Sequence, residues 1–271
     1  MSANEHILLV GFGNMGQALV RGWLANGRAT SSIEVVDPVP AAREVAAALG
    51  VAGRDDAASG AARADVVVLA VKPNQLASAL PKCAAAADRG AVFLSIAAGK
   101  TIAEIGAGLG PGSAVVRAMP NTPAAIGKGM TALVANPAVS RAQRALCGDL
   151  MAAVGAVAWL DDERHMDAVT AISGSGPAYV FLLIECFEQA AIDLGLDAAL
   201  AKQLALATVA GAGEYAAAAG EGAAELRRRV TSPNGTTQAA LEVLMGKPGM
   251  RELLVRATRA AAERSRELAK A

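Results

Sequence analysis

Apolar residues form short continuous runs in the first part of the chain, and a helical pattern follows most of them. Such runs are typical of parallel strands covered on both faces of a sheet. Strands that alternate with helices favour a doubly wound α/β sheet. The expected strands are residues 7–10, 33–36, 64–71, 91–96, 114–119, 130–135 and 156–160. The expected helices are residues 17–25, 41–49 and 140–153, with others beginning near residues 74 and 101.

The pattern changes near residue 162, after which no strand-like alternation occurs and alanine and leucine dominate. Two long expected helices, residues 176–195 and 197–218, are apolar most of the way round and need burial by another element. A homodimer with intertwined helical halves is the economical solution, and helices that fold back on the sheet are the alternative. The other expected helices are residues 163–172, 222–229, 236–244 and 249–269.

A glycine-rich turn follows the first expected strand and opens a helix. Its G-x-G-x-x-G spacing permits a tight turn, a close approach to a pyrophosphate, and close packing of helix on strand. The second expected strand ends in an acid about 20 residues further on, where a dinucleotide fold binds ribose. The alternative is a strand, turn and helix without a ligand. The expected cofactor residues are Gly11, Phe12, Gly13, Asn14, Met15, Gly16 and Asp37.

These patterns predict an α/β protein in which an N-terminal Rossmann dinucleotide-binding domain, residues 1–161, precedes an all-α domain for dimerisation and substrate, residues 162–271. Ligands of doubly wound sheets bind beyond the carboxyl ends of the strands. We therefore expect the segments that follow the strands to line one crevice. These segments are residues 11–16, 37, 72–74, 97–99 and 119–121.

Composition narrows the class of partner. The chain has 271 residues, 54% hydrophobic and 18% charged, with a formal net charge of zero, so no nucleic-acid or membrane-surface partner is expected. No apolar run approaches the roughly 20 residues of a membrane span, and no signal-peptide pattern opens the sequence. Cys83, Cys147 and Cys186 form neither a disulfide framework nor a metal site, so we expect reduced thiols in a cytoplasmic protein.

The catalytic residue types are sparse. His6 and His165 are the only histidines, and no Ser-His-Asp set, metal-ligand cluster or phosphate-transfer loop can be assembled. An enzyme that leaves the chemistry to a nicotinamide need supply only orientation and electrostatics. Reduction of an already reactive C=N bond makes the smallest demand of this kind.

Two stretches interrupt the helical half. Residues 173–179 form a small-residue turn with a proline in the first turn of the next helix; they are either a well-packed helix start or a surface that faces a ligand. Residues 230–237 end in a fresh helix, whose first N–H groups suit a small carboxylate. Ordinary capping of that helix by a side chain is the alternative.

The sequence resembles the pyrroline-5-carboxylate reductases over essentially its whole length. The resemblance implies a Rossmann domain joined to a helical dimerisation domain. It also implies hydride transfer from NADPH or NADH to C5 of 1-pyrroline-5-carboxylate, which gives L-proline in the last step of proline biosynthesis. Homodimers, or rings of dimers, follow as well. The matching stretches are residues 11–16, 70–73, 95–99, 119–123, 173–179 and 230–237.

The resemblance also assigns site residues. Backbone N–H groups of Gly235, Thr236 and Thr237 would hold the substrate carboxylate, with Ser232 in the same loop. Thr237 is the expected catalytic residue, because its hydroxyl would hydrogen-bond the ring nitrogen and relay a proton. The further cofactor contacts, mostly through backbone, would come from Val71, Lys72, Pro73, Ala97, Ala98 and Asn121.

The sequence departs from the family at Asp37, where many members place a serine, threonine or arginine. A carboxylate repels the 2′-phosphate of NADPH but accepts hydrogen bonds from the free ribose diol of NADH. Arg43 could partly restore phosphate binding. We therefore expect NADH to be used at least comparably with NADPH. The asparagine that members often carry near residues 56–57, which touches the adenosine, is missing.

Two other functions share parts of this pattern. A β-hydroxyacid dehydrogenase has the same two-domain plan and would use a lysine of the helical half, for which Lys202 is the candidate. A non-catalytic nucleotide sensor would keep the first glycine motif but would need no second site at residues 230–237.

Overall fold

A computed structural model describes residues 5–269. The chain forms two compact units. The first runs to Gly174 and takes in the chain again from Ala262 onward, and the second is Ser175–Ala261. The division by contacts thus falls later than the boundary predicted after residue 161, and the end of the last helix belongs to the first unit.

All eight strands lie in one sheet, in the order β3-β2-β1-β4-β5-β6-β7-β8. Neighbouring strands are parallel except β6 and β7, which are antiparallel. The chain connections reverse direction at β1 and β4, which is where doubly wound sheets bind ligands. The α/β Rossmann prediction is confirmed. The strands are β1 (Ile7–Val10), β2 (Ile33–Val36), β3 (Ala52–Arg54), β4 (Val66–Leu69), β5 (Val92–Ser95), β6 (Ala114–Met119), β7 (Gly129–Ala135) and β8 (Gly155–Trp159).

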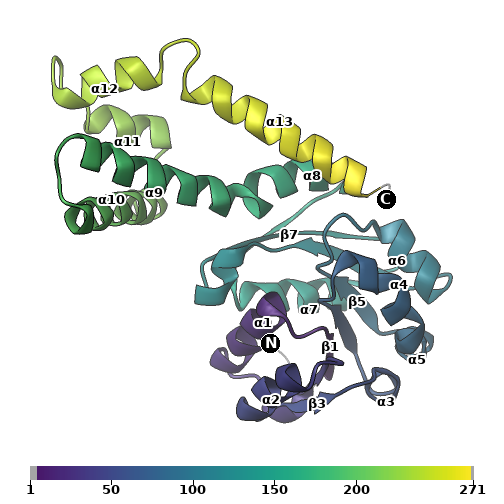
Figure 1. Ribbon diagram of the computed structural model, residues 1–271. Coiled ribbons are helices and arrows are strands. Elements are labelled where there is room, and N and C mark those ends of the chain that lie inside the picture. The colour runs from purple at the N-terminus through teal and green to yellow at the C-terminus, as the bar shows by residue number, and fades with distance from the viewer. Residues whose placement is uncertain (1–4, 270–271) are drawn as a thin grey trace. The chain divides into compact units, whose positions relative to one another are not determined.

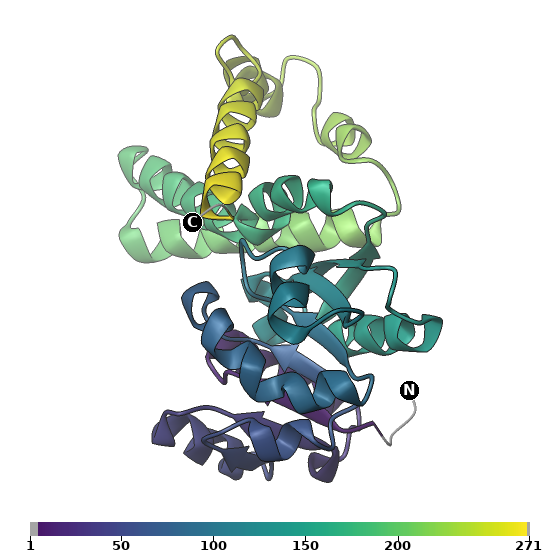
Figure 2. The same cartoon turned by 90° about the vertical axis from the view of Figure 1, so that its right-hand side faces the viewer.

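Helices cover both faces of this sheet (Figures 1 and 2). Residues of α1, α2 and α7 pack into the core on one face, and residues of α3, α4, α5 and α6 pack into the core on the other. The helices of the first unit are α1 (Asn14–Ala25), α2 (Pro40–Ala48), α3 (Ala58–Ala61), α4 (Leu76–Ala79), α5 (Ala84–Asp88), α6 (Ile102–Leu109), α7 (Arg141–Ala152) and α8 (Met166–Val169).

The central strands read as unbroken apolar runs because both of their faces are buried. In β1, Ile7 and Leu9 belong to the core of α1, α2 and α7, whereas Leu8 and Val10 belong to the opposite core. All four side chains are at most 5% exposed. The alternation of side chains across a strand therefore places every residue of β1 in a core.

Two features of the sheet were not predicted. The edge strand β3 has only three residues, Ala52–Arg54, all exposed, so no apolar run marks it. The reversal between β6 and β7 follows from the short connection between them, since parallel neighbours need a crossover of about a dozen residues or more.

The helix predicted over residues 163–172 is broken into shorter pieces. A 3₁₀ turn, Glu163–His165, precedes α8, and a π-helical turn, Thr170–Gly174, follows it. The Thr170 hydroxyl donates to the Met166 carbonyl at 2.8 Å, and the Ser173 hydroxyl donates to the Val169 carbonyl at 3.2 Å. Hydroxyls that bond the preceding turn in this way bend helices.

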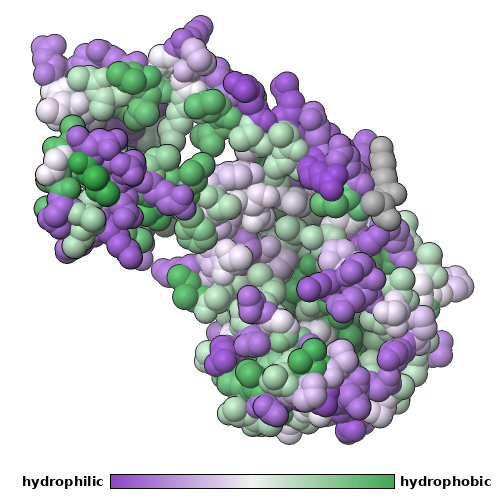
Figure 3. Space-filling view, in the orientation of Figure 1, coloured by the Kyte–Doolittle hydropathy of each residue, from purple (hydrophilic) through white to green (hydrophobic). Residues whose placement is uncertain are grey.

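The second unit consists of helices whose apolar side chains reach the surface of the single chain (Figure 3). No residue of α9 is buried, and only Ala201 and Ala205 of α10 are buried. Such helices need burial by another element. The helices are α9 (Gly176–Asp193), α10 (Ala198–Ala218), α11 (Ala223–Arg229), α12 (Thr236–Leu244) and α13 (Met250–Leu268), whose last turns belong to the first unit. Large exposed apolar side chains on α9, α10 and α13 include Phe181, Leu182, Phe187, Leu204, Leu206, Tyr215, Leu253 and Val255.

One helical stretch of the described residues, residues 163–193, is long and apolar enough to cross a membrane by length and composition alone. This corrects the expectation that no apolar stretch approaches that length. Acidic residues such as Glu185 and Glu188 interrupt the run but leave its average hydropathy high. Core helices of soluble proteins can have the same length and composition.

Candidate cofactor and substrate sites

The turn after β1 has the geometry of a pyrophosphate cradle. Gly11 has φ +96°, and a Cβ atom there would lie 2.7 Å from the Ala70 carbonyl carbon, so only glycine fits. A Cβ at Gly13 would meet no atom within 4 Å, so space for a ligand remains beside the backbone. Within residues 5–269, the N–H groups of Asn14 and Met15 at the start of α1 donate to no acceptor. Free N–H groups at a helix start bind phosphate, so these residues fit a dinucleotide.

A cavity of about 430 Å³ opens beside this turn at the carboxyl ends of β1, β2 and β4. Six of the predicted cofactor residues line it: Gly11, Phe12, Gly13, Asp37, Val71 and Lys72. Asn14, Met15 and Gly16 continue from the turn into α1, and Pro73 begins a 3₁₀ turn, Pro73–Gln75. Of the five strand ends predicted to share one crevice, those of β1, β2 and β4 therefore line this cavity.

Ala97, Ala98 and Asn121 follow β5 and β6 and do not line this cavity. Their sheet edge is the same, because β1, β2, β4, β5 and β6 are parallel. The side chain of Asn121 is already engaged: its Nδ2 donates to the Ser173 carbonyl at 3.0 Å, and its Oδ1 accepts from the Met130 N–H at 2.9 Å. A cofactor contact of Asn121 stays a prediction.

Asp37 ends β2 with both carboxylate oxygens hydrogen-bonded to backbone. Its Oδ2 accepts from the Phe12 N–H at 2.8 Å, and its Oδ1 accepts from the Val39 N–H at 2.9 Å. Arg43 Nη1 donates to the Asp37 carbonyl at 2.8 Å and to the Pro38 carbonyl at 3.0 Å. The arginine is therefore held by backbone oxygens, and the carboxylate keeps lone pairs for ribose hydroxyls.

The sequence reasoning missed an ion pair at the same cavity. Lys82 lines the cavity and donates to Asp56 Oδ2 at 2.9 Å. This hydrogen bond holds the pKa of the exposed Asp56 carboxyl below its ordinary value and raises the pKa of Lys82. The two residues are 26 positions apart in sequence, and no local motif joins them.

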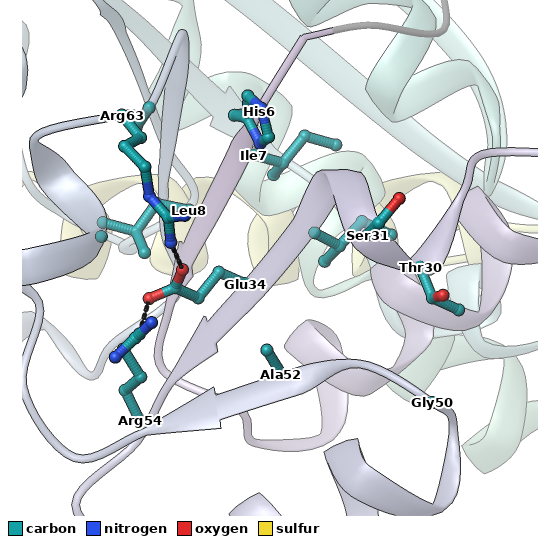
Figure 4. A pocket seen from close by; sticks show the side chains of 13 residues that line it. His6, Ile7, Leu8, Thr30, Ser31, Glu34, Gly50, Ala52, Arg54 and Arg63 are labelled. Carbon is teal, nitrogen blue, oxygen red and sulfur yellow. Dashed lines mark hydrogen bonds and ion pairs between the residues drawn. The ribbon is translucent and has the colours of Figure 1, made fainter.

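A second cavity, of about 440 Å³, lies at the opposite, amino edge of the sheet (Figure 4). Figure 4 shows the Glu34 carboxylate between Arg54 and Arg63, with His6 across the cavity. Arg63 Nη2 donates to Glu34 Oε2 at 2.8 Å. These ion pairs tie β2 to β3 and to the segment after α3, and the predicted cofactor residues lie elsewhere.

Residues 173–179 make the turn into α9. The Ser173 carbonyl accepts the Asn121 amide, and a Cβ on Gly174 would lie 2.6 Å from the terminal methyl of Met119. Ser175 is the N-cap residue without a side-chain cap, and Pro177 lies in the first turn. Close packing thus accounts for Ser173 and Gly174, and a ligand-facing role of the segment stays open.

The loop before α12 presents a helix start that its own side chains do not cap. Asn234 has φ +59° and its N–H donates to Gln238 Oε1 at 2.8 Å, which orders the turn. The N–H of Gly235 donates to the Ser232 carbonyl at 3.1 Å and is thus engaged. Within residues 5–269, the N–H groups of Thr236 and Thr237 donate to no acceptor. The carboxylate site predicted for three N–H groups therefore has two free donors.

The hydroxyls of this loop are uncommitted as well. Those of Ser232, Thr236 and Thr237 make no hydrogen bond within the described chain. A Cβ at Gly235 would lie 2.7 Å from Ser232 Oγ, so the glycine permits this approach of the serine. The Thr237 side chain is half-buried and the Thr236 side chain is exposed. No side chain of the described residues caps the start of α12, so ordinary side-chain capping, the alternative considered for this loop, is not present.

No group of histidine, cysteine and acidic residues within residues 5–269 could hold a metal ion. Cys83 and Cys147 are buried, and burial raises the pKa of the Cys83 thiol to about 11 and that of Cys147 to about 12. The thiolate is the reactive form, so these two thiols are inert near neutral pH. Lys202 lies exposed on α10.

Known proteins resemble each half of the chain. Residues 163–268 match the family described as "Pyrroline-5-carboxylate reductase dimerisation". Residues 6–99 match the family described as "NADP oxidoreductase coenzyme F420-dependent". The two matches coincide with the helical half and with the part of the sheet that carries the glycine turn and Asp37.

The similarity to full-length relatives covers nearly the whole chain. A pyrroline-5-carboxylate reductase of Pseudomonas aeruginosa is 43% identical over 268 residues, which are 98% of each chain. The solved structure of a pyrroline-5-carboxylate reductase from Coxiella burnetii is 39% identical with a TM-score of 0.94, over 98% of this chain and 99% of that one. The enzyme of Plasmodium falciparum, solved with NADP bound, is 28% identical with a TM-score of 0.86, over 98% and 99%. This chain therefore belongs to the pyrroline-5-carboxylate reductase family.

Proposed function

We propose that this protein reduces 1-pyrroline-5-carboxylate to L-proline with NADH or NADPH as the hydride donor. The full-length similarity to pyrroline-5-carboxylate reductases carries this assignment. The two arrays of free N–H groups, one at the start of α1 and one at the start of α12, supply the matching anion sites.

The first unit holds the cofactor. The N–H groups of Asn14 and Met15 bind the pyrophosphate beside the open backbone of Gly13, and Asp37 accepts the ribose hydroxyls. Val71, Lys72, Pro73, Ala97, Ala98 and Asn121 are the proposed further contacts. When bound, the nicotinamide supplies the hydride.

The start of α12 holds the substrate. The Thr236 and Thr237 N–H groups bind its carboxylate with the positive end of the helix behind them. The Thr237 hydroxyl donates to the ring nitrogen and relays to it, from solvent water, the proton that this nitrogen gains when C5 accepts the hydride. Ser232 adds a hydroxyl at the rim. The protein thus orients two reactants and moves one proton.

NADH is used at least comparably with NADPH in this proposal. Asp37 faces the cavity with a negative charge, and Asp55 lines the same cavity. Arg43 already donates to two backbone carbonyls, so it offers the 2′-phosphate less compensation than a free guanidinium.

The enzyme works as a homo-oligomer, because the dimerisation family covers the helices that a single chain leaves exposed. A homodimer, alone or in a ring of dimers, is the proposed assembly. The proposal includes a cytoplasmic location, supported by three free cysteines, and no nucleic-acid or membrane partner.

Purified protein tests the function directly. It should oxidise NADH and NADPH only when pyrroline-5-carboxylate is present, with L-proline as the product. It should not reduce NAD with β-hydroxyacids, which the hydroxyacid dehydrogenase alternative requires. Cofactor binding without turnover would support the nucleotide-sensor alternative instead.

A further inference from the structure

The chain leaves the first unit at Gly174 and re-enters it at Ala262, and a hydrogen bond joins the two crossing segments. Ser265 Oγ, on α13, donates to Asp167 Oδ1, on α8, at 2.6 Å. Ser265 is only 6% exposed. Arg266 Nε lies 3.8 Å from the other carboxylate oxygen of Asp167. A short hydrogen bond from a buried hydroxyl to a carboxylate is of the strong, charge-assisted kind.

The same last turns of α13 lie close to the loop that follows β5. A Cβ atom on Gly99 would lie 3.6 Å from the carbonyl carbon and the Cβ of Leu268, which is ordinary van der Waals contact. Ala262, one turn before Ser265, is also buried. The end of α13 therefore lies against the residues that immediately follow Ala97 and Ala98, beside α8 (Figure 1).

The β5–α6 loop is held at its two ends, since Ala97 is buried in the core and Thr101 forms a capping box with Glu104, whereas its middle has fewer contacts. Gly99 has φ +72° and Ala98 is exposed, and the Ala97 N–H donates to Ser95 Oγ at 3.3 Å. At its far end, the Ile102 N–H donates to Glu163 Oε1 at 2.9 Å. Glu163 lies just before α8, and Asp167 lies within α8. The segment from Glu163 to Asp167 therefore bonds the far end of the loop directly and reaches its middle through the last turns of α13.

We propose that Asp167 and Ser265 are positioning residues for the cofactor: by fixing the last turns of α13, they fix the loop that presents Ala97 and Ala98 to the nicotinamide nucleotide. The proposal rests on the cofactor contacts proposed above for these two alanines. It gives the last described turns of α13 a part in cofactor affinity, although none of their residues lines the cavity beside the glycine turn.

Asp167→Asn and Ser265→Ala test the proposal, and Glu267→Gln is the matched control. Glu267 pairs with Arg264 on the same turns of α13, but both side chains are about two-thirds exposed. Ser265→Ala keeps a good helix former and removes only the hydroxyl, so it folds even if Asp167→Asn does not. Two quantities are measured without turnover: the dissociation constant for NADH, and amide hydrogen exchange of residues 97–101 in the cofactor-free protein.

We expect both test variants to raise the dissociation constant about fivefold, the effect of one lost hydrogen bond, and to speed exchange in the loop. The KM of both test variants for pyrroline-5-carboxylate should be unchanged. In the control variant, the dissociation constant for NADH and the exchange of the loop should both equal those of the wild type. Unchanged exchange in both test variants, or faster exchange with unchanged NADH affinity, would overturn the proposal. Wild-type protein that binds NADH but does not turn over pyrroline-5-carboxylate would instead refute the proposed function. The dissociation constant and the hydrogen exchange would still test the positioning role.

Discussion

The Asp37 carboxylate accepts a hydrogen bond from the Phe12 N–H at 2.8 Å, so the acid that ends β2 also fixes the glycine turn that follows β1. In the proposed cofactor site, this one contact couples the recognition of the ribose to the shape of the turn that binds the pyrophosphate. A neutral substitution at Asp37 therefore changes both the charge that faces the ribose and the support of the turn.

Asp37→Ser is expected to raise the ratio of kcat/KM for NADPH to that for NADH by about tenfold, because it removes a charge that repels the 2′-phosphate. Steady-state kinetics with each cofactor at saturating pyrroline-5-carboxylate measure the ratio. Asp55→Ser is the control, since Asp55 lines the same cavity without a hydrogen bond to the turn, and its effect should be smaller. Wild-type protein that strongly favours NADPH would refute the proposed role of Asp37.

Thr237→Ala is expected to lower kcat by roughly tenfold to a hundredfold with a smaller change in KM, because it removes the proton-donating hydroxyl and keeps the backbone N–H. Thr237→Ser should restore most of the rate. Thr236→Ala is the matched control on the neighbouring, exposed residue and should leave kcat near the wild-type value. An unchanged rate in Thr237→Ala would reduce this threonine to a structural residue.

Glu163→Ala should destabilise the protein more than Arg117→Met does. Arg117 is 5% exposed and donates to Glu163 Oε1 at 2.8 Å, so loss of the acid leaves a buried cation unpaired, at a cost of roughly 3 kcal/mol. The loss also frees the Ile102 N–H at the start of α6. Loss of the arginine leaves an acid that water can reach. Urea unfolding of both variants compares the two free energies, and equal values would contradict the argument.

Stability should fall in mild alkali because two thiols are buried. Burial raises the pKa of Cys83 to about 11 and of Cys147 to about 12, from 9.0 in an unfolded chain. Above pH 9 the unfolded state binds fewer protons than the folded state. The thiols therefore contribute their full stabilisation below pH 9, and the free energy of unfolding falls as the pH rises from 9 towards 11 and 12.

The expected loss is roughly 1 kcal/mol for each thiol per pH unit within this window. Urea unfolding on both sides of the unfolded pKa measures it. Cys147→Ala should be less stable than wild type below the window, since it leaves a small cavity, but should lose less within it. A loss as large as that of wild type would show that the thiol of Cys147 is not its source.

Local pattern predicted most of the fold because both faces of the sheet are buried. Ile7 to Val10 are apolar throughout for this reason, whereas the exposed strand Ala52–Arg54 carries no such signal. Candidate site residues could be named from the sequence where a motif is contiguous, as at Gly11 to Gly16 and Gly235 to Thr237, and their roles stay predictions. The sequence could not predict which backbone N–H groups are free. The Gly235 N–H, for example, is engaged because the turn brings it to the Ser232 carbonyl.

The contacts that support the site join residues far apart in the chain. Ser265 and Asp167 are 98 positions apart, and Ile102 and Glu163 are 61 apart. No periodicity or motif links such pairs, because each residue is common in its own element. Only the packing of α8 and of the last turns of α13 within the first unit brings them together.

The most direct test of the central claim is the transfer of label from NADH that carries deuterium at both hydrogen positions of C4 of the nicotinamide. Turnover of pyrroline-5-carboxylate by the purified protein should give L-proline with deuterium at C5, as mass spectrometry and NMR would show. Proline without the label, or oxidation of NADH without proline, would contradict the claim that this protein delivers a hydride to the carbon of the C=N bond.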